Sequence, residues 1–316
     1  MKQDVITLGE SLVAFIPDTH TKLRYVHRFG KVVVGAESNV AVGLAKLGYS
    51  TGWVSKVGDD EFGHFIIREL RAEGVDTSSV TVSSEGPTAI MFKQFSNSLD
   101  TSVFYYRAGS AASTMSKDSI DWNYLKRTKI IHISGITSAL SNTCRHMVEA
   151  VFAFAKQEHI LISFDPNIRR KLMREEEAKD ILKPLLLQAD IALLGENEGH
   201  TLLGTDNPEE IAKILLDHGC RSVGVKRGNK GAYVASGTKG FFIEPYPVQV
   251  VDTIGAGDAF NAGFLAGLLK NQSIEQCGKM GVLLGALAVS SQGDVEGLPD
   301  GDTFQQLMEN REEIHR

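Results

Sequence analysis

The chain has 316 residues, of which 42% are hydrophobic and 23% are charged, and its formal net charge is −6. These values are ordinary for a globular protein and exclude a mainly disordered or fibrous chain. The negative charge disfavours binding to nucleic acid or to an anionic membrane surface, because such surfaces select basic patches.

The cysteines and the first residues predict a cytoplasmic protein. Cys144, Cys220 and Cys277 lie far apart and form no CxxC pair, which favours reduced, buried thiols over a disulfide framework or a zinc site. The first residues lack the apolar run of a signal peptide, and no apolar stretch reaches the length of about 18 residues that a membrane span needs.

Short apolar runs alternate with helical patterns along most of the chain, as expected for a mostly parallel sheet covered by helices. The predicted strands are Val5–Leu8, Ile130–Ile133, Leu161–Phe164, Ile191–Leu194 and Val223–Lys226. Asn39–Leu47 and Glu61–Ala72 each carry one apolar stripe, which predicts helices. A further helix is predicted between Asn207, its cap, and Gly219, with Pro208 at its first position.

Two segments, Leu12–Val34 and Thr88–Tyr106, break this rhythm. Both are rich in β-branched and aromatic residues and carry no helical pattern, and the second reads as a hairpin with a turn at Asn97–Asp100. We expect a small sheet, drawn from about residues 12–34 and 88–107, that projects from a single domain of residues 1–316 as a lid or a subunit contact.

The strongest local motif is VQVVDTIGAGDAFNAG at residues 248–263, a strand-like run followed by a glycine turn and a helix that begins near Asp258. Gly255 and Gly257 let backbone N–H groups approach an anion, and a helix N-terminus favours negative charge. A carboxylate beside a phosphate is repulsive unless it accepts a proton from an attacking hydroxyl. Taken alone, the motif also fits a glycine turn with Asp258 as an ordinary first-turn residue.

DTIGAGDAFNAGF resembles the C-terminal signature of the ribokinase-like (PfkB) carbohydrate kinases, and VVVGAESNVAVGLAKLG with VSKVGDDEFG resembles their N-terminal signature. No GxxxxGK[ST] motif occurs, so the chain does not resemble a P-loop kinase. The resemblance implies an α/β, ribokinase-like fold, with a mostly parallel central sheet, flanking helices and a small β-sheet lid.

The resemblance also implies a catalytic centre. Asp258 would take the proton of the sugar hydroxyl as that hydroxyl attacks the γ-phosphate of ATP. The backbone amides of Gly255, Ala256 and Gly257 would form the hole that stabilises charge on the transferring group.

The resemblance also implies that the nucleotide and the cations bind to the C-terminal half of the chain. Lys226, Gly228 and Gly231, together with Gly257, resemble the residues that contact ATP, although Lys230 in the same turn fits a solvated lysine equally well. Leu284–Ser291 with Gly293-Asp294 resembles the helix and loop beside the adenine, but Val282 stands where many relatives carry Asn.

Glu198 resembles the residue that organises water around Mg²⁺, whereas Gly195 stands where relatives often carry Asn. Asp252 and the carbonyl of Ile254 resemble a site for a monovalent cation such as K⁺. For Asp252 the alternative is a residue that caps the turn.

The sugar side distinguishes among relatives. The stretches GAESN, YYRAGSAAS and FDPNIR are most similar to 2-keto-3-deoxygluconate kinases, which implies phosphorylation of 2-keto-3-deoxy-D-gluconate on its 6-hydroxyl. Two arginines that converge would grip a carboxylate, which guanidinium matches with two hydrogen bonds. Met91 stands where some relatives offer Tyr, and Asn39 has helix capping as an alternative role. The implied sugar contacts are Gly35, Asn39, Tyr105, Arg107, Asn167 and Arg169.

Two alternatives stay open. Several fructokinases share the FDPN.R stretch and a lid arginine, so fructose competes with the keto acid as substrate. A catalytically idle sugar or nucleotide sensor on the same fold is a second alternative, which retention of Asp258 argues against. We further expect small-molecule ligands only, with self-association through the lid.

Overall fold

In the computed structural model, residues 2–95 and 101–314 are described, and their main feature is a nine-stranded sheet. Its order is β13-β12-β11-β10-β9-β8-β1-β4-β5. The strands from β5 to β11 pair in parallel, and β12 and β13 add an antiparallel hairpin at one edge. The strands are β1 Gln3–Leu8, β4 Thr51–Gly58, β5 Val80–Ser83, β8 Thr128–Ser134, β9 Leu161–Asp165, β10 Ile191–Gly195, β11 Ser222–Lys226, β12 Ala232–Ser236 and β13 Lys239–Ile243.

Both faces of this sheet are covered by helices, because its strands carry apolar residues on both sides. In β8, Ile131 and Ile133 join one hydrophobic cluster, while their neighbour Ile130 joins another on the opposite face; this follows from the alternation of side chains along a strand. The helices are α1 Ala36–Lys46, α2 Glu61–Ala72, α3 Trp122–Leu125, α4 Gly135–Leu140, α5 Asn142–Glu158, α6 Glu175–Leu186, α7 Glu196–Leu203, α8 Pro208–Asp217, α9 Ala256–Leu269, α10 Ile274–Val289 and α11 Gly301–Ile314.

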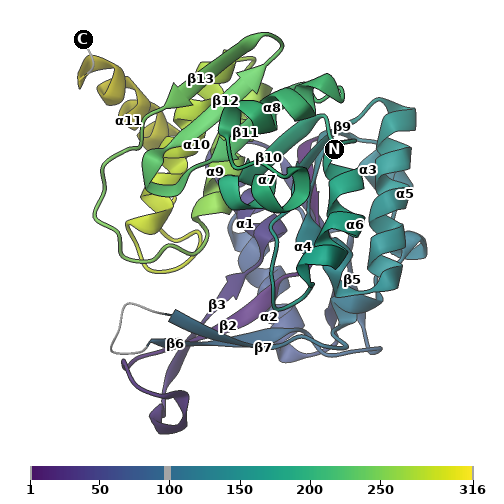
Figure 1. Cartoon of the computed structure of the whole chain (residues 1–316). Coiled ribbons are helices and arrows are strands. Elements are labelled where there is room, and N and C mark those ends of the chain that lie inside the picture. Colours follow the sequence, from purple (N-terminus) through teal and green to yellow (C-terminus); the bar gives the residue numbers. More distant parts are fainter. Residues whose placement is uncertain (1, 96–100, 315–316) are drawn as a thin grey trace.

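A second, four-stranded sheet projects from this body, as the two aromatic segments predicted (Figure 1). Its order is β3-β2-β6-β7, and β6 and β7 pair antiparallel as a hairpin. We call it the lid sheet; its strands are β2 Leu12–Pro17, β3 Phe29–Val34, β6 Ile90–Phe95 and β7 Thr101–Tyr106. Most of the turn predicted at Asn97–Asp100 lies outside the described residues. One short 3₁₀ turn, Leu23–Tyr25, interrupts the first segment.

One predicted element is wrong. The strand-like run Val248–Val251 forms no strand: the chain from residue 244 to residue 255 is irregular, and both Val250 and Val251 are more than half exposed. Pro245 and Pro247 lack the N–H groups that a strand pairing needs. The segment is instead tied to α10, because the N–H of Val251 donates to the carbonyl of Val289 at 2.8 Å.

Helix boundaries follow local chemistry. Asp60 caps α2 by accepting hydrogen bonds from the N–H groups of Phe62 at 3.1 Å and Gly63 at 2.8 Å. Asn207 caps α8 as predicted, and Pro208 is the first residue of that helix. None of the described helices is long and apolar enough to cross a membrane.

Candidate active site

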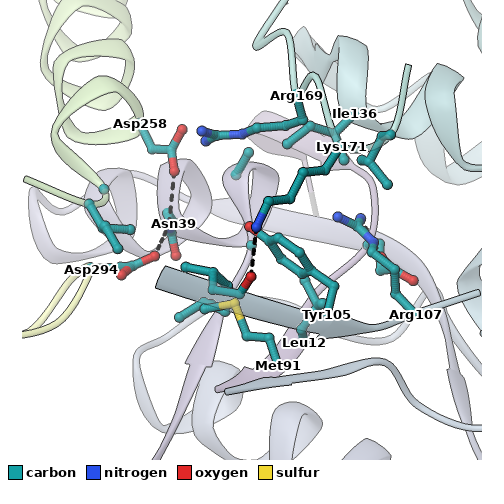
Figure 2. A pocket seen from close by; sticks show the side chains of 18 of the residues that line it. Leu12, Asn39, Met91, Tyr105, Arg107, Ile136, Arg169, Lys171, Asp258 and Asp294 are labelled. Atoms are coloured by element: carbon teal, nitrogen blue, oxygen red, sulfur yellow. Dashed lines mark hydrogen bonds and ion pairs between the residues drawn. The ribbon is translucent and has the colours of Figure 1, made fainter. Parts of the chain in front are cut away.

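A cavity of about 470 Å³ lies where the carboxyl ends of β1, β8 and β9 face the lid sheet (Figure 2). Ligand sites in open parallel sheets form at this edge, because loops from several strands meet there. Its lining comes from the lid sheet, the loops after β1, β8, β9 and α10, and the starts of α1 and α9: Glu10, Leu12, Val34, Gly35, Ala36, Asn39, Met91, Ser102, Val103, Tyr105, Arg107, Ile136, Ile168, Arg169, Arg170, Lys171, Leu172, Ile254, Gly255, Asp258 and Asp294.

The glycine turn before α9 is shaped by Gly255. This residue has φ +83°, and a Cβ placed on it would lie 2.7 Å from the carbonyl oxygen of Asp294, so only glycine fits without strain. Helix α9 begins at Ala256, and the N–H groups of its first turn have no acceptor within the helix. The turn therefore places amide donors that lack a partner within the helix beside the cavity.

Asp258 lies in that first turn with a buried side chain. Its Oδ2 accepts a hydrogen bond of 2.8 Å from Asn39 Nδ2, which also donates to Asp294 Oδ2 at 3.1 Å. Burial raises the pKa of Asp258 to about 7, helped by the carboxylates of Asp165 and Asp294, while Asn39 and Lys226 oppose the rise. The carboxyl group can thus accept a proton near neutral pH.

The alternative role of Asn39 as a helix cap is wrong. Gly35 precedes α1 as its cap residue, and Asn39 lies within the helix. Its buried side chain bridges two carboxylates of the C-terminal half, so its amide fixes the position of Asp258.

Behind Asp294 lies a fully buried lysine, Lys93 of β6, of which 1% is exposed. Its Nζ lies 3.3 Å from Asp252 Oδ2 and 3.6 Å from Asp294 Oδ1. Asp252 also accepts a hydrogen bond from the N–H of Ile254 at 3.1 Å through its other oxygen, the turn-capping role that the sequence left open. An ammonium group of the lid sheet therefore neutralises two acids beside the glycine turn.

The opposite wall of the cavity is basic. Arg107 forms an ion pair with the buried Glu10, whose other oxygen accepts from the hydroxyl of Ser110. Burial raises the pKa of Glu10, against the pull of Arg107. The Nε of Arg107 is buried and has no hydrogen-bond acceptor in the described part of the chain.

Three consecutive basic residues, Arg169, Arg170 and Lys171, follow β9 and line the same cavity. They are exposed, and Lys171 donates to the carbonyl of Val103 at 2.8 Å. In Figure 2, Arg169 extends toward Asp258, whereas Arg107 lies across the cavity beyond Lys171 and Tyr105. The two arginines therefore share one cavity without their guanidinium groups meeting.

A buried polar network lies at the carboxyl ends of β9, β10 and β11. Lys226 Nζ lies 2.6 Å from Asp165 Oδ2, and Asn261 Nδ2 donates to the same oxygen at 2.7 Å. A Cβ added to Gly257 would lie 3.6 Å from Lys226 Nζ, so this ammonium reaches the glycine turn. The carboxylates of Asp165 and Glu198 raise the pKa of Lys226, although burial alone would lower it.

Two glycines shape the turn after β11. Gly228 and Gly231 have φ values of +58° and +80°, and a Cβ on Gly231 would overlap the carbonyl oxygen of Ile243. The turn therefore requires glycine at position 231 for both conformation and space.

The predicted magnesium residue, Glu198, accepts hydrogen bonds from the N–H groups of Ile168 at 2.8 Å and Gly195 at 2.7 Å. Within residues 2–95 and 101–314, no group of three or more His, Cys, Asp or Glu side chains could hold a metal ion. Mg²⁺ bound mainly by phosphate and water needs no such group. Each oxygen of Glu198 keeps a lone pair for such a water, so the residues present fit a phosphate-bound Mg²⁺.

The predicted site residues fall into two groups. One group lines the cavity: Gly35, Asn39, Tyr105, Arg107, Arg169, Ile254, Gly255 and Asp258. The other lies outside its lining: Asn167, Glu198, Lys226, Gly228, Gly231, Asp252, Ala256 and Gly257. Gly195 gives its N–H to Glu198, Val282 is buried in the core, and Met91 lines the cavity.

Sequence reasoning missed four residues of this site, Glu10, Lys93, Arg170 and Lys171, and misplaced a fifth, Asp294. Asp294 was expected beside the adenine, but its side chain lies against Asn39 on the cavity wall. The run of three basic residues after β9 was the available signal for Lys171. A single lysine within a strand pattern gave no signal for Lys93.

The fold and this site together define a carbohydrate kinase. The family model described as pfkB family carbohydrate kinase matches residues 2–301, and the chain belongs to that family. It is therefore a phosphotransferase that acts on a sugar with ATP.

The chain is also similar to individual proteins of this family over nearly their whole length. Over its full length the chain is 38% identical to a 2-dehydro-3-deoxygluconokinase of Bacillus subtilis, covering 98% of that protein. It is 30% identical to a 5-dehydro-2-deoxygluconokinase of Clostridium perfringens, over 99% of this chain and 94% of that one. A protein of E. coli described as a ribokinase II, solved in complex with ATP and Mg²⁺, superposes with a TM-score of 0.90 at 30% identity, over 98% and 99% of the two chains.

Proposed function

We propose that this enzyme transfers the γ-phosphate of ATP to the 6-hydroxyl of 2-keto-3-deoxy-D-gluconate. The observation that carries the proposal is a single cavity with a proton acceptor, Asp258, on one wall and a row of basic side chains on another. A sugar acid has a hydroxyl at one end and a carboxylate at the other, so it matches both walls at once.

Asp258 is proposed as the general base. Its pKa of about 7 lets it be ionised at neutral pH and still hold a proton well enough to help the hydroxyl attack. The amides of Gly255, Ala256 and Gly257 would stabilise charge on the transferring group, since helix N-termini favour anions.

The basic wall is proposed to recognise the carboxylate. Arg170 and Lys171 bring two positive charges to the cavity, and Arg169 adds a third that extends toward Asp258. A neutral hexose has no use for these charges. The unpaired Nε–H of Arg107 would gain an acceptor in a bound oxygen, which removes the cost of a buried, unsatisfied donor. Tyr105 and Gly35 lie close enough to contact the same ligand.

ATP is proposed to lie on the far side of the glycine turn, where Lys226, Gly228, Gly231 and Gly257 face its phosphates. Glu198 would hold water of a phosphate-bound Mg²⁺, and when bound this ion would neutralise the charge that develops on the phosphates. A monovalent cation at Asp252 and Ile254 stays a prediction.

The choice of substrate is tested with purified enzyme, ATP and three candidates: 2-keto-3-deoxygluconate, its isomer 5-keto-2-deoxygluconate, and fructose. We expect kcat/KM to be highest for the first. A preference for fructose would make the enzyme a fructokinase, and binding of ATP without turnover of any sugar would favour a sensor.

Arg107→Ala should raise KM for the keto acid by about ten-fold or more, because a charge-assisted contact is lost. KM for ATP should stay unchanged. The matched control is Arg174→Ala, an exposed arginine at the start of α6 that pairs with Glu177. An unchanged KM for the keto acid in Arg107→Ala would show that the carboxylate binds elsewhere.

A further inference from the structure

Lys93 is among the largest fully buried side chains of the molecule, yet it carries a charge. A buried ammonium group persists only where paired acids offset its loss of hydration. Here the offset comes from two carboxylates of the C-terminal half, Asp252 at 3.3 Å and Asp294 at 3.6 Å. Lys93 thus joins the lid sheet to the loops on both sides of the glycine turn.

One of these carboxylates, Asp252, was predicted to hold a monovalent cation together with the carbonyl of Ile254. A cation held by Asp252 would lie beside the like charge of Lys93, because the Lys93 ammonium group is paired with Asp252 Oδ2, while Asp252 Oδ1 accepts the N–H of Ile254. Asp294 Oδ1 has no hydrogen-bond donor among the described residues, and the nearest charge to it is again Lys93. The side-chain oxygens of this site therefore already have a positive partner.

We propose that the ammonium group of Lys93 takes the place of a dissociable monovalent cation, so that this kinase needs no K⁺. The inference rests on the proposed kinase mechanism and extends it by one positioning residue. K⁺ and an ammonium group carry the same charge and are similar in size, so either can neutralise the pair of acids.

The effect on the site follows from two contacts. Asn39 joins Asp294 to Asp258, at 3.1 Å and 2.8 Å. The backbone of Asp294 also packs against Gly255, where a Cβ would meet the Asp294 carbonyl at 2.7 Å. A shift of Asp294, or a negative charge on it that nothing offsets, would therefore disturb both Asp258 and the backbone amides of the glycine turn.

Without a cation, Asp252 and Asp294 would place two negative charges beside the point where phosphate arrives. Like charges at short range in a poorly solvated site repel strongly. Lys93 removes that repulsion and, because it belongs to β6, it does so from the lid sheet. A separate cation would give no such link between the lid and the glycine turn.

The first test compares wild-type kcat in potassium, sodium and tetramethylammonium chloride at equal ionic strength. We expect values within about two-fold of one another, because screening is equal in the three salts. A wild-type enzyme activated several-fold by K⁺ would overturn the proposal, whatever the sugar.

The second test uses Lys93→Ala, which leaves the acids and opens space for an ion. In tetramethylammonium chloride its kcat should fall at least about ten-fold, and K⁺ should restore much of it in a saturable way. Lys93→Met fills the space without charge, so K⁺ should not restore its activity. Lys126→Ala, which removes an exposed lysine paired with Glu158, serves as control and should behave as wild type in every salt.

A third measurement needs no substrate. The melting temperature of Lys93→Ala should rise with KCl more than with tetramethylammonium chloride, since a ligand that binds only the folded state stabilises it. Wild type and Lys93→Met should show no such difference. A Lys93→Ala enzyme that is folded but shows no K⁺-selective change in kcat or melting temperature would also overturn the proposal. If that variant does not fold, the wild-type comparison still decides.

The outcomes separate this inference from the proposed function. The enzyme could show no turnover with any sugar, while the melting temperature of wild type is equal in the salts and that of Lys93→Ala rises selectively with K⁺. This result would reject the proposed kinase function and support Lys93 as the built-in cation. Turnover of a sugar that depends on K⁺ would support the kinase function and reject the proposal for Lys93.

Discussion

Asp258 is a carboxyl group whose surroundings disfavour its ionised form. It is buried, two further carboxylates lie near it, and these surroundings raise its pKa to about 7. Asn39 holds its orientation with a single amide hydrogen bond. A base of this kind is strong enough to accept a proton and yet is about half ionised near neutral pH.

The activity should follow this ionisation. We expect kcat/KM for the sugar to fall about ten-fold for each pH unit below about 7, because only the ionised form of Asp258 accepts the proton. A pH series from 5 to 9, with ATP saturating, gives the profile. A plateau that continues down to about pH 5 would place the base elsewhere.

Asp258→Asn should lower kcat by about three orders of magnitude and leave ATP binding nearly unchanged. It should also stabilise the fold above about pH 7. The folded protein holds this proton more tightly than the unfolded chain, so the stability linked to the group is full below its usual pKa of 3.8 and is lost as pH rises through about 7.

Melting temperatures of the wild type and of Asp258→Asn at pH 5 and pH 8 measure this effect. From pH 5 to pH 8, the melting temperature of the variant should rise by several degrees relative to that of wild type. Such a gain in stability at the expense of activity is common when a catalytic residue is replaced. A variant that keeps more than about a tenth of the wild-type kcat would contradict the role of base.

At this scale the sequence predicted residues that belong to a motif and missed those that do not. Asp258 stands in a glycine turn whose chemistry is readable from residue types alone. Asn39 was named as a sugar contact, with capping as an alternative, but its bridge between Asp258 and Asp294 spans more than 200 positions of the chain and could not be predicted. Lys93 was missed because only the packed structure shows that its charge is buried.

Among the elements, the turn after β11 shows how backbone and space act together. Gly231 has a left-handed φ of +80°, and a side chain there would also overlap the carbonyl oxygen of Ile243 in β13. Gly237, between β12 and β13, has φ +57° but open space around its Cβ position. A comparison of the two glycines therefore separates the cost of the left-handed backbone from the cost of steric overlap.

Gly231→Ala should destabilise the protein by at least about 2 kcal/mol, from the left-handed backbone plus the overlap. Gly237→Ala, the matched control, should lose only about 1 kcal/mol, because the backbone conformation is its sole cost. Urea unfolding of both variants gives the two free energies. Equal losses would show that the turn moves to make room for a methyl group.

Elements whose apolar period is clear were predicted well. Glu61–Ala72 matches α2 at both ends, because Asp60 and one apolar stripe define it. The run Val248–Val251 was taken for a strand because of its valines, but a strand needs a neighbour with free N–H and C=O groups. No residue type encodes that neighbour, although the preceding Pro245 and Pro247 were an available signal against strand pairing.

For the molecule as a whole, the lid sheet is the part that projects from the body (Figure 1). Its contacts with other segments include Lys93 against Asp252 and Lys171 against Val103. Its β7 strand presents two exposed aromatic residues at alternate positions, Phe104 with 44% and Tyr106 with 65% of the surface accessible. Alternate residues share a face of a strand, so these two rings form one apolar surface.

We expect this surface to pair with the same surface of a second copy, since exposed apolar patches on otherwise soluble chains mark contact sites. Sedimentation velocity should then show a dimer, and the double variant Phe104→Glu, Tyr106→Glu should sediment as a monomer with a nearly unchanged melting temperature. Val82→Glu, an exposed valine of β5 outside the lid sheet, is the control and should remain dimeric. A monomeric wild type at all concentrations, or a double variant that stays dimeric, would show that these two rings form no subunit contact.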